Sequence, residues 1–96
     1  MELVSRIVAV AQPEQIILFG SAARGAVYED SDLDILVIKS GANRRELAGR
    51  IYRQLLGFGR PVDIVVATPE DIERYRHSPA LVLAPALKEG VLIYAR

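Results

Sequence analysis

The hydrophobic positions of the chain fall into alternating helix-like and strand-like stretches. Near the start, apolar residues recur at helical spacing at Val4, Ile7, Val8 and Ala11. Pro13 ends that pattern. Further apolar runs, bounded by glycine, proline or polar residues, predict strands over 16–19, 33–38, 62–67 and 91–95. The run over 33–38 is apolar at almost every position, which indicates a strand buried on both faces and covered by helices.

Between these runs, residues that favour helix ends predict further helices. Asn43 followed by Glu46 is a capping-box pattern at the start of one helix. The expected buried stripe of that helix is Leu47, Ile51 and Leu55. Thr68, followed by proline and two acidic residues, predicts the start of the next helix, and a last one is expected between residues 78 and 90.

This order of elements predicts an α+β fold of the α/β type. We expect a small mixed β-sheet of about four strands flanked by helices, within a single domain over 1–96. Only residues 20–32 separate the first two predicted strands. Because a parallel crossover needs about a dozen residues or more and usually a helix, this pair is expected to be antiparallel.

The amino-acid composition says more about the cellular environment of the protein than about its function. Lys plus Arg and Asp plus Glu number 12 each, so the formal net charge is zero and no bulk attraction to nucleic acid is indicated. The chain has no cysteine, which weakly favours a reducing, cytoplasmic environment. No apolar run reaches the roughly 20 residues that a membrane helix needs. We therefore expect no membrane partner and no direct nucleic-acid binding.

Acidic residues stand at the ends of two predicted strands. Asp32 and Asp34 are two positions apart, so in an extended strand they share a side, with Cα atoms roughly 6.5–7 Å apart. Two carboxylates at that spacing can bind one divalent ion or a pair of ions, and oxygen-only ligands favour Mg²⁺ or Mn²⁺. Asp63 interrupts another apolar run, and a lone buried aspartate is costly unless it is paired or metal-bound. If the two strands are neighbours, Asp63 completes a three-carboxylate cluster.

A second feature precedes the acids. Gly20 and Ser21 follow the first predicted strand and lead into a possible single turn of helix. Backbone N–H groups at such a turn, with the Ser21 hydroxyl, form an anion cradle that a side chain at Gly20 would obstruct. A phosphate cradle facing a carboxylate metal site suits nucleotidyl or phosphoryl transfer, in which an aspartate can orient or deprotonate the attacking hydroxyl.

The stretch LFGSAARGAVYEDSDLDILV resembles the signature of the minimal nucleotidyltransferases (MNT) of the DNA polymerase β superfamily. The resemblance extends over nearly the whole chain and implies a polymerase β-like nucleotidyltransferase fold. It also implies Mg²⁺ as cofactor, with Mn²⁺ as an alternative, and ATP as substrate. The implied metal ligands and catalytic residues are Asp32, Asp34 and Asp63, and the implied nucleotide-binding residues are Gly20, Ser21 and Arg24.

Chains of this length resemble the antitoxins of HEPN–MNT pairs. That likeness implies transfer of AMP from ATP to a tyrosine of a partner HEPN toxin. Two alternatives stay open: a non-catalytic antitoxin that acts by occlusion or by binding nucleotide, and nucleotidyl transfer to a small molecule. At the level of residues, Asp32 and Asp34 could be turn acids, Asp63 could pair with an arginine, and Gly20 and Arg24 could be a turn glycine and a solvated arginine.

Overall fold

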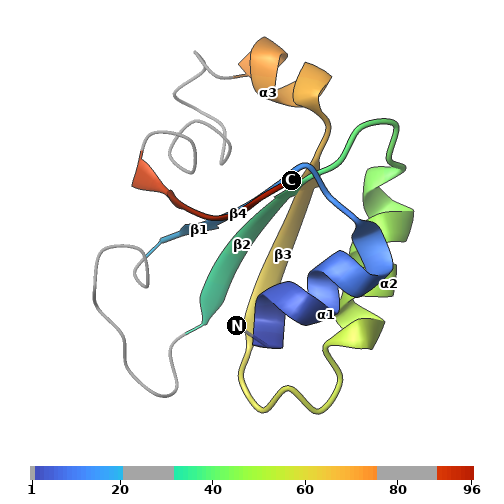
Figure 1. The fold of residues 1–96 in the computed structure, drawn as a ribbon, viewed down its shortest axis with the longest axis vertical. Helices are drawn as coiled ribbons and strands as arrows, with labels where there is room; N and C mark the ends of the chain where they lie inside the picture. Colours follow the sequence, from blue (N-terminus) through green and yellow to red (C-terminus); the bar gives the residue numbers. More distant parts are fainter. Residues whose placement is uncertain (1, 21–31, 76–88) are drawn as a thin grey trace.

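The computed structural model describes residues 2–20, 32–75 and 89–96 (Figure 1). Its elements are α1 (Glu2–Ala11), β1 (Gln15–Phe19), β2 (Leu33–Ile38), α2 (Arg44–Gln54), β3 (Val62–Ala67), α3 (Pro69–Tyr75) and β4 (Val91–Ala95). These bounds agree closely with the predicted strands and the first three predicted helices. The helix predicted before Gly90 lies outside the described residues. In the described part, no helix is long and apolar enough to cross a membrane.

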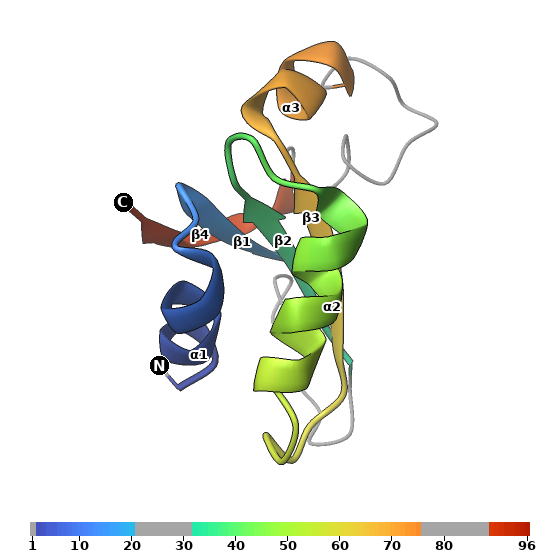
Figure 2. The ribbon, with the colours of Figure 1, turned by 90° about the vertical axis from the view of Figure 1, so that its right-hand side faces the viewer.

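The strands form one mixed sheet in the order β3-β2-β1-β4. β1 pairs antiparallel with both β2 and β4, whereas β2 and β3 are parallel. The predicted antiparallel pairing of the first two strands is therefore confirmed, as is the mixed sheet of four strands. Figures 1 and 2 show α1 and α2 side by side on one face of the sheet, with α3 beyond the far end of β3.

The two faces of β2 belong to two different cores. Ile35 and Val37 pack on the side of α1 and α2, where the main core contains Ile7 and Ile51. Leu36 and Ile38 point to the opposite face and form a smaller cluster, to which Ile17, Ala67, Phe19, Val65 and Ile72 also belong. β2 is thus buried on both faces, as its apolar sequence predicts. Since side chains alternate along a strand, Asp34 lies on the face away from α1 and α2.

Side-chain hydrogen bonds at the N-termini of α2 and α3 fix the loops that connect these helices to the sheet. Asn43 Oδ1 accepts a hydrogen bond from the Glu46 N–H at 3.1 Å, which confirms the predicted N-cap of α2. At α3, Thr68 Oγ1 accepts from the Asp71 N–H at 3.1 Å, and Asp71 Oδ2 accepts from the Thr68 N–H at 3.0 Å. This reciprocal pair fixes the start of α3 directly after β3.

Candidate active site

The end of β1 lies against an aspartate of β2. Phe19 is the antiparallel register partner of Asp34, and Gly20 follows it with a φ of +74°. A Cβ atom built on Gly20 would overlap Asp34 Oδ2 and would lie 3.1 Å from Asp34 Cγ. The left-handed backbone favours glycine at residue 20, and any larger residue there would also require the Asp34 carboxylate to move.

The sequence-based explanation of Gly20 was different. It attributed the glycine to the approach of an anion, whereas the structure shows that the group in contact with it is the Asp34 side chain. Ser21 and Arg24, the other predicted nucleotide-binding residues, lie outside the described residues. The predicted phosphate cradle therefore stays a prediction, with Gly20 as the residue that joins it to the acidic strand.

The parallel pairing of β2 and β3 brings two of the predicted acids side by side. Asp34 and Asp63 are register partners on neighbouring strands. Their backbones are therefore about 4.8 Å apart, and their side chains lie on the same face of the sheet. Asp34 is half-buried and Asp63 is exposed. Asp32 is also exposed and directly precedes β2. The condition for a three-carboxylate cluster, that the strands of Asp34 and Asp63 be neighbours, is met.

Asp34 is the carboxyl group most affected by this arrangement. Burial raises the pKa of Asp34, and the negative charges of Asp63 and Asp32 raise that pKa further. Asp63 and Asp32 therefore both lie within electrostatic range of Asp34. A cation among them would favour the ionised form of Asp34, and carboxylate oxygens are the ligands that Mg²⁺ and Mn²⁺ prefer.

The register of the strands alone does not bring the three carboxylate groups into contact. Among residues 2–20, 32–75 and 89–96, no three Asp, Glu, His or Cys side chains lie close enough together to hold a metal ion. Adjacent carboxylates repel one another, so side chains on abreast backbone positions are free to diverge. The structure thus aligns the strands of Asp32, Asp34 and Asp63, and rotation of the side chains would be needed for all three to contact one ion.

Phe19 is a neighbour of the acids that the sequence analysis did not single out. It lies opposite Asp34 in the sheet and packs, partly buried, on the same small cluster as Leu36 and Val65. Asp34 is therefore flanked by an aromatic residue on β1 and by Asp63 on β3. In the sequence, Phe19 could have been identified as a neighbour of the site by its position directly before Gly20, which follows β1.

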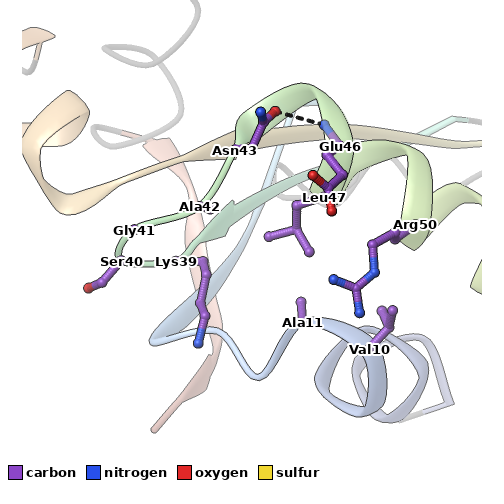
Figure 3. Close-up of a pocket in the computed structure, with 10 residues that line it drawn as sticks. All are labelled: Val10, Ala11, Lys39, Ser40, Gly41, Ala42, Asn43, Glu46, Leu47 and Arg50. Carbon is purple, nitrogen blue, oxygen red and sulfur yellow. Dashed lines mark hydrogen bonds between the residues drawn. The ribbon is translucent and has the colours of Figure 1, made fainter.

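A cavity of about 330 Å³ lies at the other end of β2. It is lined by Val10 and Ala11 of α1, by Lys39 after β2, and by Asn43 and Arg50 at and within α2, as Figure 3 shows. None of the three aspartates lines this cavity. It is separated from Asp34 by most of the length of β2 and is not part of the acidic site.

The strands that carry Asp34 and Asp63, together with β1 and the glycine that follows it, belong to a nucleotidyltransferase domain. The family model described as a nucleotidyltransferase domain matches residues 2–95, so the chain belongs to that family. The resemblance seen in the sequence is confirmed, and the chain is a nucleotidyltransferase. Among curated proteins, none matches the sequence at a significant level.

Solved structures share the fold over almost the whole chain. A Sulfolobus solfataricus protein assigned as a nucleotidyltransferase is 25% identical with a TM-score of 0.65, and the match covers 99% of this chain and 76% of that one. A toxin–antitoxin structure with AMP-PNP is 21% identical with a TM-score of 0.63, covering 99% and 73%. A mutant toxin–antitoxin MntA–HpeT complex is 18% identical with a TM-score of 0.64, covering 99% and 71%. At these last two identities the likeness shows the fold alone.

Proposed function

We propose that this nucleotidyltransferase uses a divalent metal ion to transfer AMP from ATP to a tyrosine of a partner HEPN toxin, and that it acts as an antitoxin. The observation that carries the proposal is the pairing of Asp34 with Asp63 beside Gly20. Two acids abreast on parallel strands, next to the strand end where a triphosphate is expected, form the centre of a two-carboxylate or three-carboxylate transfer site.

Each described residue has a role that follows from its position. Asp32, Asp34 and Asp63 would hold Mg²⁺ or Mn²⁺, which supplies positive charge to the phosphate oxygens during transfer. Asp34 is the half-buried member of the three and lies against Gly20. Asp63 is exposed and is therefore accessible to an incoming hydroxyl, which it can orient or deprotonate. Ser21 and Arg24 would bind the triphosphate.

The choice of ATP and of a toxin partner rests on the solved structures and on the sequence resemblance. A protein of this fold occurs in a toxin–antitoxin structure with AMP-PNP, an ATP analogue. The MntA–HpeT mutant carries two aspartate-to-glutamate changes two positions apart, which is the spacing of Asp32 and Asp34 here. These likenesses support a toxin as the partner, and the resemblance to MNT antitoxins supports a HEPN toxin and a tyrosine acceptor.

A transfer assay tests the proposal. The chain is incubated with radiolabelled ATP, Mg²⁺ and a HEPN toxin. Intact-mass spectrometry determines whether the toxin gains the mass of AMP, and fragmentation of the modified peptide determines whether the AMP is on a tyrosine. We expect Asp34→Asn and Asp63→Asn each to lower the rate roughly a hundredfold or more, the scale of losing one electrostatic group from a transition state. Glu70→Gln, which changes an exposed acid on α3, is the control and should keep the rate.

Two results would contradict the proposal in different ways. If both asparagine variants transfer AMP at the wild-type rate, Asp34 and Asp63 are not the catalytic acids. If the partner is inhibited but gains no mass, the chain acts by occlusion.

A further inference from the structure

One face of α2 points away from the core and combines apolar residues with arginines. Arg45, Gly49 and Tyr52 follow one another at spacings of four and three, so they form a stripe along the helix. Arg53 lies beside this stripe, and Leu56 follows directly after the C-cap residue of the helix. We call these residues the α2 outer face. Tyr52 is 44% exposed and Leu56 is 77% exposed.

Of the two large apolar residues of the α2 outer face, Tyr52 is held through its side chain and Leu56 through its backbone. The Tyr52 hydroxyl accepts a hydrogen bond from the Ile64 N–H at 2.8 Å. The backbone carbonyl of Leu56 accepts from Arg6 Nη1 at 3.2 Å, and the Arg6 guanidinium lies over the Phe58 ring at 5.6 Å. A preorganised surface loses little conformational entropy when a partner binds, which favours docking.

The arginines give this face a positive charge that the rest of the chain does not share. α2 carries Arg44, Arg45, Arg50 and Arg53 against a single acid, Glu46, in a chain whose net charge is zero. Arg44 pairs with Asp71 at 3.3 Å. In the described part of the chain, neither the Arg45 side chain nor the Arg53 side chain forms a hydrogen bond or an ion pair. Arg53 Nη1 lies 3.6 Å from where a Cβ of Gly49 would be, so its guanidinium covers the glycine.

An apolar centre bordered by arginines is typical of a protein interface. Interface cores are enriched in aromatic residues and arginine, and tyrosine and arginine are frequent hot spots. A nucleic-acid site would instead need cations that follow a backbone, without an exposed leucine at the centre. Of the exposed large apolar residues in the described part, Tyr52 and Leu56 lie here, and Val91 and Leu92 lie on β4 at the edge of the sheet.

The α2 outer face also borders the acidic strand. The Tyr52 hydroxyl bonds to the N–H of Ile64, which directly follows Asp63 on edge strand β3. Figure 2 shows α2 in front of β3 along much of its length. The Asp63 side chain points to the sheet face opposite α2, so a protein bound on α2 would reach it around the β3 edge of the sheet.

We propose that the α2 outer face docks the acceptor protein, through an acidic surface with an apolar hollow that receives Tyr52 and Leu56. This inference rests on the proposed function, since it concerns the protein that accepts AMP. The binding energy comes from the apolar centre, and the arginines select an acidic partner and speed its association.

Affinity measurements with the HEPN toxin used in the transfer assay test the proposal. We expect Leu56→Asp to raise the Kd at least tenfold, and Arg45→Glu with Arg53→Glu to do the same with an effect that shrinks at high salt. Matched controls are Leu92→Asp, which changes an exposed leucine on β4, and Arg50→Glu, which reverses a charge on α2 outside the α2 outer face. Both controls should stay within about threefold of wild type.

The outcomes separate docking from catalysis. If the face variants raise the KM for the partner and leave kcat unchanged, while Asp34→Asn abolishes transfer and keeps binding, both proposals stand. Docking is refuted if the face variants bind like wild type, if they lose only binding to a single-stranded RNA probe, or if Leu56→Asp abolishes only self-association. Binding that depends on the face, with no AMP transferred, would refute the proposed function alone.

Discussion

Replacing Gly20 by alanine would test the contact on which the candidate site depends. The added Cβ would meet Asp34 Oδ2, and the residue would also have to keep a φ of +74°. Gly57 provides a matched control, because its φ is +79° and a Cβ there would meet nothing within 4 Å. Gly57→Ala therefore changes only the backbone preference, whereas Gly20→Ala changes the backbone preference and displaces a carboxylate.

The expected magnitudes follow from these two costs. A left-handed conformation costs a residue with a Cβ about 1–2 kcal/mol, which is the expected loss of stability in Gly57→Ala. Forcing an extra carbon into a packed position costs roughly 1–3 kcal/mol more, so Gly20→Ala should lose about 2–5 kcal/mol. For a domain of this size, each kcal/mol lowers the Tm by about 4–8 °C.

A double-mutant cycle isolates the contact. In an Asp34→Ala background the carboxylate is absent, so Gly20→Ala should cost no more than Gly57→Ala does. The coupling between positions 20 and 34 should then equal the overlap term of roughly 1–3 kcal/mol. Urea unfolding followed by far-UV circular dichroism measures all of these variants. If Gly20→Ala and Gly57→Ala lose the same stability in the wild-type background, the contact between Gly20 and Asp34 has no energetic role.

Two further predictions concern the charge of the site. Because burial and the neighbouring carboxylates raise the pKa of Asp34 above 3.8, the folded state binds a proton more tightly than the unfolded state, and stability is lost as pH rises through the raised pKa. Asp34→Asn should therefore unfold at higher urea than wild type at neutral pH, and its advantage should vanish as the pH falls below 3.8; an equal advantage at all pH values would contradict this. Mg²⁺ or Mn²⁺ at a hundredfold excess over Kd should stabilise the wild type by about 2.7 kcal/mol in scanning fluorimetry, relative to EDTA. A double variant with Asp32→Asn and Asp34→Asn should lose that response, and a full response would remove these acids from the metal site.

The strands could be predicted from the sequence because each is a short apolar run with a clear boundary. β2 and β3 begin and end where the runs over 33–38 and 62–67 do. The antiparallel pairing of β1 with β2 followed from the length of the segment between them. Strand order is different, because it depends on contacts between distant segments. From the sequence, Asp63 could be assigned to the cluster only on the condition that its strand lies beside that of Asp34.

The contact of Gly20 and the exposed residues of α2 also depend on how distant segments pack, so the sequence could not predict them. The reason for the glycine depends on the register between Phe19 and Asp34, which no local pattern specifies. On α2, the buried stripe was predicted at Leu47, Ile51 and Leu55, and the structure buries all three. Leu56 follows that stripe, and only the fold shows that its side chain is exposed and that its backbone carbonyl accepts a hydrogen bond from Arg6.

The parallel pairing of β2 and β3 connects the acidic site to the surface of α2. If β3 ran antiparallel over the same span, Asp63 would lie opposite Val37 rather than opposite Asp34. Parallel neighbours require a crossover that returns the chain to the same end of the sheet, and α2 is that crossover. The helix that brings Asp34 and Asp63 abreast is therefore also the helix that lies beside the acidic strand. A partner bound to the α2 outer face would contact the element that sets the position of Asp63, and it would reach the Asp63 side chain, which lies on the opposite face of the sheet, around the β3 edge.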